Sequence, residues 1–189
     1  PGRSRLVWGA CRGEGAGGVF FRYGIRGPLF REEFDEGREA VGDYHFWIRR
    51  YDRLARADRR LIAEQIARFE HPPLISVLLP VYNSHPKWLR RAVRSVQAQL
   101  YPRWELCVAN DASTDPKIWP LLEKLARRDP RIRIVRRAEN GHISAASNDA
   151  LSLARGEFVA LLDHDDEPET TALYYVATAP QTKTALQVI

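Results

Sequence analysis

Three carboxylates stand within four consecutive positions, at Asp163, Asp165 and Asp166, directly after the apolar run 158–162. Acidic groups this close repel one another, and a folded chain accommodates the repulsion best when a cation or a positively charged partner offsets it. A divalent cation would do so, because carboxylate oxygens are ligands that such ions prefer. For this run alone two interpretations stay open: a metal site, or a solvated acidic turn after a strand.

Three other apolar runs are also followed by residues that could bind a ligand. They are followed by Pro80-Val81-Tyr82-Asn83, by residues 110–115 beginning with Asn110 and Asp111, and by residues 139–142. Any one of these loops could be an ordinary turn, since Asn, Asp, Ser and Gly favour turns for local backbone reasons. Four such loops favour a binding site if the fold brings them to one place.

The pattern of apolar residues from Leu74 onward alternates between strands and helices. Short apolar runs predict strands at 74–79, 104–109, 132–135 and 158–162. Helical spacing predicts helices at 88–100, 118–127 and 144–154, the last of which Gly156 ends. Strands joined by helices of this length run parallel through right-handed crossovers. The sequence therefore predicts an α/β fold: a Rossmann-like, open, mostly parallel sheet with helices on both faces.

Such a sheet binds ligands outside the carboxyl ends of its strands, which is where the four loops fall. No Gly-x-Gly-x-x-Gly loop follows the first strand, and no Gly-Lys-Ser or Gly-Lys-Thr loop occurs. Dinucleotide redox chemistry and P-loop phosphoryl transfer are therefore disfavoured. A nucleotide diphosphate bound here would need a cation held on carboxylates, and the acidic run supplies them.

The chain before this pattern divides into two parts. Residues 1–40 are rich in Gly and Arg and predict a flexible leader. Residues 41–72 predict a helical lead-in of two helices, with Asp58 as a cap between them and His71-Pro72-Pro73 as the end. Residues 73–178 then form the ligand-binding domain, and residues 179–189 form a tail of different character.

Composition narrows the class of protein. The chain has 189 residues, 44% of them hydrophobic, which suffices for a core. It contains no apolar stretch long enough to span a membrane and no secretory signal, so we expect a soluble, cytoplasmic protein. The net charge of +5 divides into +3 up to Pro72 and +2 beyond it, and 25 of the 29 basic residues are Arg. Because no basic block stands out, nucleic-acid binding is a minor hypothesis. Cys11 and Cys107 are expected to be plain thiols.

The residues from Leu74 to about Tyr174 resemble the inverting glycosyltransferases of family 2, which have the GT-A fold and use nucleotide-activated sugars. The resemblance rests on four segments. They are Ile75-Ser76-Val77-Leu78-Leu79-Pro80-Val81-Tyr82-Asn83, residues 104–115, residues 140–148 and Gly156-Glu157-Phe158-Val159-Ala160-Leu161-Leu162-Asp163-His164-Asp165-Asp166. The helical lead-in also resembles that of bacterial members that build surface polysaccharides. The chain is thus expected to be the nucleotide-binding, N-terminal half of a GT-A fold.

The resemblance implies roles for residues of the first two loops. Pro80, Val81 and Tyr82, with Asn83 beside them, would lie around the uracil and ribose of a UDP-sugar. The alternative for Tyr82 is an ordinary core or rim aromatic. Asp111 would accept the N3 proton of uracil.

Asn110 stands where the family usually has the first acid of a pair with Asp111. It would make a weaker contact to the nucleotide, or it would only cap the loop.

The acidic run takes its roles from the same resemblance. Asp163 would contact the nucleotide and the metal, Asp165 would be the principal metal ligand, and Asp166 would support the sugar or the other ligands of the metal. In an extended segment Asp163 and Asp165 point the same way and His164 points to the other side. Hard oxygen ligands around a diphosphate suit Mg or Mn.

Three further polar residues have less specific expectations. His142 and His164 are expected to pack or hydrogen bond rather than bind the metal. Asn148, on the third helix, would face the nucleotide sugar, although ordinary capping explains it about as well.

The implied reaction is transfer of the sugar to a hydroxyl of a saccharide or lipid-linked acceptor, with inversion. It needs a general base, which in the family lies well downstream, whereas this chain ends 23 positions after Asp166. We therefore expect a truncated chain that lacks the base, and an inactive fragment with only nucleotide, metal or partner binding is the alternative. A phosphatase is disfavoured, because its Asp-x-Asp pair follows an early strand.

Overall fold

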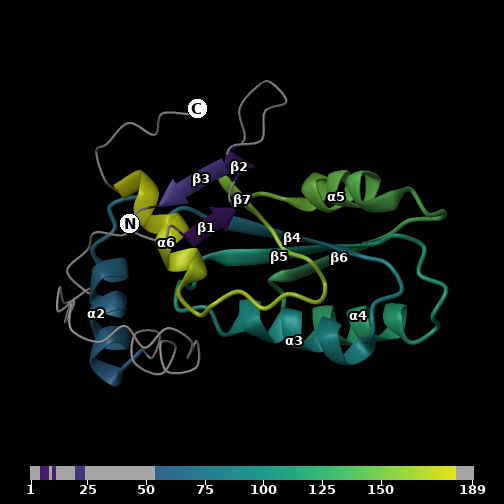
Figure 1. The fold of residues 1–189 in the computed structure, drawn as a ribbon, viewed down its shortest axis with the longest axis horizontal. Coiled ribbons are helices and arrows are strands. Elements are labelled where there is room, and N and C mark those ends of the chain that lie inside the picture. Colours follow the sequence, from purple (N-terminus) through teal and green to yellow (C-terminus); the bar gives the residue numbers. More distant parts are fainter. Residues whose placement is uncertain (1–4, 9, 12–19, 24–53, 182–189) are drawn as a thin grey trace, which may run out of the picture.

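The computed structural model describes residues 5–8, 10–11, 20–23 and 54–181. Its centre is a five-stranded sheet with the order β2-β7-β4-β5-β6 (Figure 1). Four strands run parallel: β4 (Ile75–Val81), β5 (Trp104–Asn110), β6 (Ile132–Arg136) and β7 (Phe158–Leu161). The short β2 (Ala10–Cys11) pairs antiparallel with β7 at the edge. The predicted α/β, mostly parallel sheet is confirmed.

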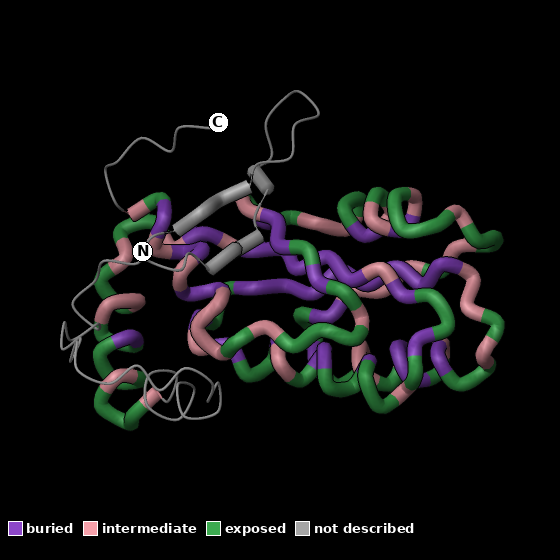
Figure 2. Tube along the Cα trace, in the orientation of Figure 1, coloured by how far each residue is buried: buried purple, intermediate pink, exposed green. Residues whose placement is uncertain are grey.

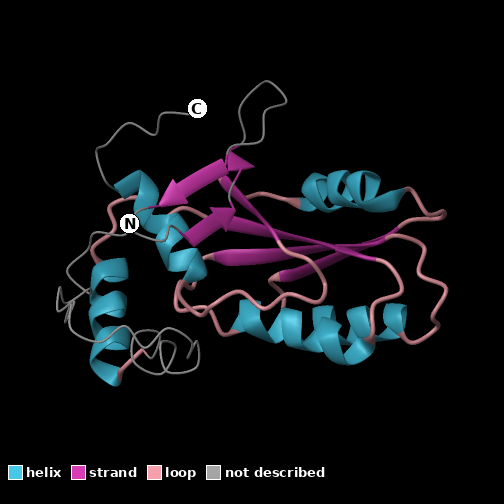
Figure 3. Cartoon of the chain, in the orientation of Figure 1, coloured by secondary structure: helices cyan, strands magenta, loops and turns pink. Residues whose placement is uncertain are grey.

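Helices cover both faces of this sheet (Figure 3). On one face lie α3 (Pro86–Gln97) and α4 (Ile118–Arg128), and on the other lies α5 (His142–Leu153). Each helix connects consecutive parallel strands, as right-handed crossovers require. The three-layer arrangement leaves the ends of the strands as the open edges of the domain.

The core follows from the alternation of side chains along the central strands. In β4, Val77 and Leu79 pack with the core on the α3 and α4 side, while Leu78 packs with Ala146 and Ala150 of α5. All seven residues of β5 are buried. Strands covered on both faces read as continuous apolar runs, which is why the sequence predicted them so clearly.

The strand and helix bounds differ from the predicted ones by at most three residues. The main consequence is that Pro80 and Val81, expected in the first loop, are the last two residues of β4. Val81 is buried with 1% of its surface exposed. Its side chain therefore packs in the core beneath the edge of the sheet and is not open to a ligand.

The second helix of the predicted lead-in is α2 (Arg56–Ala67). Its Asp58 carboxylate accepts a hydrogen bond from the Ala55 N–H at 2.8 Å, so Asp58 caps this helix from inside its first turn. Ile62 of α2 is buried in the main core, and Tyr174 donates a hydrogen bond to Gln65. The predicted first helix lies outside the described residues.

Short strands stand in the segment expected to be a flexible leader. β1 (Arg5–Trp8) pairs antiparallel with β3 (Phe20–Tyr23), and β2 joins the main sheet. The expected flexible leader did not include these strands, and its flexibility stays a prediction. The remainder of residues 1–40 lies outside the described part.

After β7 the chain runs through an irregular segment to α6 (Ala172–Thr178) and a short 3-10 turn, η1 (Ala179–Gln181). Leu173, Tyr174 and Ala177 of α6 are buried in the main core. Residues 182–189 of the predicted tail lie outside the described part. None of the helices described here is long and apolar enough to cross a membrane.

Candidate functional site

The four predicted loops meet at the edge formed by the carboxyl ends of the parallel strands. The strand order places β7 and β5 on opposite sides of β4, so the chain reverses direction across the sheet between β4 and β7. Open α/β sheets bind ligands at such a switch point. Backbone hydrogen bonds join neighbouring loops there: Asp111 N–H donates to Val81 O at 2.8 Å, and Arg137 N–H to Asn110 O at 3.0 Å.

Asn83 ties the first loop to the second. Its side-chain oxygen accepts hydrogen bonds from the N–H of Thr114 at 2.8 Å and of Asp115 at 3.2 Å, and from the Thr114 hydroxyl at 3.2 Å. Its own N–H donates to the Ser113 hydroxyl at 3.0 Å. Asn83 also has a φ of 47°, a conformation that Asn tolerates better than most residues. These contacts make it a structural link between the loops.

Tyr82, beside Asn83, is 46% exposed at the end of β4. It is therefore available as a rim aromatic for a ligand that enters the edge. Its aromatic ring is not buried in the core, so contact with a nucleotide and an ordinary rim aromatic both stay open for this position.

Asn110 and Asp111 are both buried, with 1% and 2% of their surfaces exposed. The Asn110 side-chain oxygen accepts a hydrogen bond from the Ser113 N–H at 3.2 Å. This contact caps the loop, which was the alternative role expected from the sequence. The Asn110 side-chain nitrogen is buried without a hydrogen-bond partner. Asn110 thus shapes the second loop and still has a donor to offer.

Asp111 is held by two groups from the chain that follows β6. Its Oδ1 lies 2.8 Å from Nε of Arg137 and accepts the Gly141 N–H at 2.9 Å. Arg137 also forms an ion pair with Asp149 of α5. Its guanidinium, 19% exposed, therefore bridges the second loop and α5, and it fixes the Asp111 carboxylate in one orientation.

Gly141 is required at its position by this arrangement. A Cβ added there would lie 2.5 Å from Nη2 of Arg137 and 2.8 Å from the Cβ of Ala145. Distances that short are forbidden, so a side chain would displace the guanidinium. The glycine lets the third loop approach Asp111 closely.

The acidic run is a turn. β7 ends at Leu161, Leu162 N–H donates to Leu78 O at 3.0 Å, and Asp166 N–H donates back to Asp163 O at 3.1 Å. The expected extended geometry, with Asp163 and Asp165 on one side, is therefore wrong: β7 pairs with β4 only as far as Leu161 opposite Leu78, although β4 itself continues to Val81, and beyond that pairing the chain curls.

The three carboxylates of this turn, Asp163, Asp165 and Asp166, are exposed. The His164 Nδ1 is buried without a hydrogen-bond partner, 3.8 Å from Oδ1 of Asp165. No three His, Cys, Asp or Glu side chains converge as a metal-binding group within the described ranges. The donor set nonetheless fits Mg or Mn, since such ions are commonly held by one or two carboxylates together with substrate phosphates.

Asn148 does not join the other predicted residues. It is exposed on α5 and lies two residues from both Ala146 and Ala150, which pack on the sheet. At 100° per residue it therefore faces away from the sheet. His142, at the start of the same helix, is exposed with a φ of 62°.

A comparison with known protein families agrees with this fold and with the position of the four loops. The model of glycosyl transferase family 2 matches residues 76–186, which is more than half of the chain and contains all four loops. The chain belongs to this family.

Two relatives of the family 2 chain are much longer. An uncharacterised protein of Sinorhizobium fredii is 45% identical over 133 residues, which are 70% of this chain and 15% of that protein. The O-antigen biosynthesis protein RfbC of Myxococcus xanthus is 34% identical over 142 residues, which are 74% of this chain and 11% of that protein. The family 2 chain therefore spans a small part of the length of these relatives.

A solved structure is similar in fold. The crystal structure of S. aureus TarS 1-349 in complex with UDP-GlcNAc has a TM-score of 0.50 and 30% sequence identity, covering 56% of this chain and 30% of that one. Together with the parallel sheet, this likeness confirms the Rossmann-like, GT-A type of fold.

Two residues of the family 2 chain that support the edge were not predicted. The first is Arg137, which lies just after a strand in an Arg-rich sequence. Because arginine is so common there, the sequence did not distinguish Arg137 as a functional residue. The second is Gln99, which follows α3 and is 8% exposed. Its side chain binds the backbone of the segment after the acidic turn, at Glu169 and Leu173.

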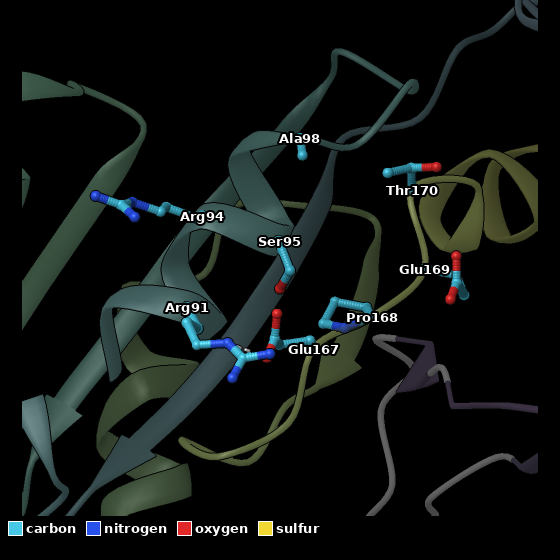
Figure 4. A pocket seen from close by; sticks show the side chains of 8 residues that line it. All are labelled: Arg91, Arg94, Ser95, Ala98, Glu167, Pro168, Glu169 and Thr170. Carbon is cyan, nitrogen blue, oxygen red and sulfur yellow. Dashed lines mark ion pairs between the residues drawn. The ribbon is translucent and has the colours of Figure 1, made fainter. Parts of the chain in front are cut away.

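A shallow hollow of about 360 Å³ lies between α3 and this segment (Figure 4). Across it Arg91 pairs with Glu167, with Nε and Oε1 2.6 Å apart. This ion pair and Gln99 both connect α3 to the chain that leaves the acidic turn.

Proposed function

We propose that this chain is the part of a glycosyltransferase that binds a nucleotide-diphosphate sugar through a divalent cation, for transfer to an acceptor hydroxyl with inversion. One observation carries the proposal: at the switch point of a family 2 fold, a buried and oriented carboxylate, Asp111, stands on the same edge as an exposed turn of three carboxylates. The first suits recognition of a base and the second suits a cation on a diphosphate.

The residues of the edge divide the work. Pro80 and Val81 form the floor at the end of β4, and the exposed ring of Tyr82 covers the base or ribose. The Asp111 carboxylate, oriented by Arg137 and Gly141, accepts the N3 proton of uracil. Asn110 offers its unpaired side-chain nitrogen, and Asn83 holds the loops together. UDP is favoured as the nucleotide because the TarS structure contains UDP-GlcNAc.

Asp163 and Asp165 are the proposed metal ligands, and Asp166 supports the sugar. When bound, Mg or Mn would neutralise negative charge on the departing nucleoside diphosphate. The carboxylates of Asp163, Asp165 and Asp166 would hold the cation just after the end of β7. We assign no general base among the described residues. A saccharide or lipid-linked acceptor and a cytoplasmic location remain predictions.

The test is calorimetry of the folded protein with UDP, with and without Mn²⁺. We expect binding that depends on Mn²⁺ and is lost in Asp165→Ala, while Asp115→Ala, in a neighbouring loop, retains it. Absence of Mn²⁺-dependent binding by the correctly folded protein would sink the proposal.

An inactive chain that only binds nucleotide and metal would give the same calorimetric result. Release of UDP from UDP-sugars separates the two possibilities. Turnover that disappears in Asp165→Ala identifies an enzyme, and binding without turnover identifies the inactive alternative.

A further inference from the structure

The positive charge of this protein is concentrated on one layer of the fold. α3 carries four cationic side chains and no acid, and α4 carries three cationic side chains and one acid. Their combined net charge of +6 exceeds the +5 of the whole chain. By contrast α5, on the other face of the sheet, has one acid and neither Lys nor Arg. An Arg-rich composition alone would not produce this asymmetry.

Tertiary structure joins the two helices into one surface. Both lie on the same face of the sheet, and Gln97 at the end of α3 donates a hydrogen bond at 3.1 Å to Asp129, which follows α4. Figure 2 shows that the sides of α3 and α4 turned away from the sheet are exposed. The exposed cations are Lys87, Arg90, Arg91, Arg94, Lys124, Arg127 and Arg128. We call this set the basic face.

An aromatic side chain lies within the basic face. Trp88 is 41% exposed, and Lys87 and Arg91 lie over its ring with their charged groups 5.4 and 4.9 Å from the ring centre. Tryptophan flanked by cations is the combination found at the boundary between lipid headgroups and acyl chains. Trp88 lies on the exposed side of α3 and does not line the hollow beside that helix.

We propose that the basic face of α3 and α4 docks this protein on the surface of a membrane rich in anionic lipid. Each Lys or Arg near such a surface strengthens binding about fivefold, so several together suffice for reversible attachment. The face borders the segment after the acidic turn, where Arg91 pairs with Glu167 (Figure 4). Docking therefore sets the candidate site at the margin of the membrane surface. The proposal goes beyond donor binding and does not depend on it.

The test is co-sedimentation with vesicles of phosphatidylcholine, with and without phosphatidylglycerol, in EDTA and without nucleotide. The double variant Arg94→Gln/Arg127→Gln removes two exposed cations that lie outside the candidate site. Its matched control is Arg56→Gln/Arg59→Gln, which removes two exposed cations from α2. Circular dichroism checks that both variants are folded.

We expect binding only to the anionic vesicles, weakened by salt, reduced about 25-fold in the α3 and α4 variant and much less in the α2 control. Equal binding to neutral vesicles, equal losses in both variants, or no binding would overturn the proposal. Tighter binding to duplex DNA than to anionic vesicles, with the same loss in the variant, would also overturn it and assign the face to nucleic acid. Because UDP and Mn²⁺ are absent, failure of donor binding leaves this result unaffected.

Discussion

The side-chain amide of Gln99 donates a hydrogen bond to the carbonyl oxygen of Glu169 at 2.7 Å, across 70 positions of sequence. The same amide accepts from the N–H of Leu173 at 2.9 Å, at the start of α6. Leu100 N–H adds a bond to Thr170 O at 2.8 Å. The end of α3 therefore fixes the chain that leaves the acidic turn, and with it the position of the three carboxylates.

Replacing Gln99 by Met keeps its length and removes these two hydrogen bonds, together with those that the Gln99 side-chain nitrogen donates to Ser95 O at 3.2 Å and to Pro168 O at 3.5 Å. Because the buried N–H of Leu173 loses its partner, we expect a loss of about 1–3 kcal/mol in the free energy of unfolding. We also expect weaker Mn²⁺-dependent UDP binding, measured by calorimetry at a temperature where the variant is folded. The control is Gln97→Met on the exposed side of α3, which should leave UDP binding unchanged. Equal binding by Gln99→Met and the wild type would show that Gln99 has no influence on the acidic turn.

Arg137→Ala removes the guanidinium that orients Asp111. Breaking a buried ion pair leaves an uncompensated carboxylate, so we expect a destabilisation of about 3 kcal/mol together with weaker UDP binding. Denaturant unfolding and calorimetry measure the two effects. The neighbouring Arg136→Ala loses only a contact with the Trp119 ring, 5.5 Å from its centre, and should cost less than about 1 kcal/mol. Similar effects from the two substitutions would contradict the assigned role of Arg137.

Gly156→Ala tests the close approach of the chain before β7 to the start of β4. An added Cβ would lie 2.6 Å from Leu74 O and 2.8 Å from Ser76 N, which are backbone atoms that cannot move aside cheaply. We expect a destabilisation of about 1–3 kcal/mol in urea unfolding. Glu157→Ala, exposed next to it, should be near neutral. A stable Gly156→Ala protein would mean that β7 and β4 are not paired as described.

Asp129 gives the stability a dependence on acid pH. Hydrogen bonds from Arg131, with a further one from Gln97, lower the pKa of Asp129 from 3.8 to about 2. A carboxyl whose folded pKa is depressed stabilises the fold above its unfolded pKa, and that contribution is lost as the pH falls through the folded value. In Asp129→Asn we therefore expect lower stability at neutral pH and a smaller loss between about pH 4 and pH 2. Parallel pH profiles of the two proteins in thermal unfolding would refute this.

The central strands could be predicted from the sequence because they are buried on both faces. Leu79 and Leu106 lie in continuous apolar runs, which no surface strand would show. The sequence located the acidic turn, but it did not predict the conformation of its backbone. Whether Asp163 and Asp165 share one side depends on where β7 loses its pairing with β4, which is a property of two strands rather than of one segment.

The sequence by itself determined the alternation of strands and helices, the family, and the four loops that must meet at one edge, since these depend on local apolar period and short motifs. Only the tertiary structure decided which side chains act together. Arg137 reaches Asp111, Gln99 reaches Glu169, and cations of α3 and α4 that look dispersed along the chain share one face. The physical reason is that parallel crossovers place residues that are far apart in sequence on the same edge or layer. The pattern of residues along the chain does not show which of them become neighbours in space.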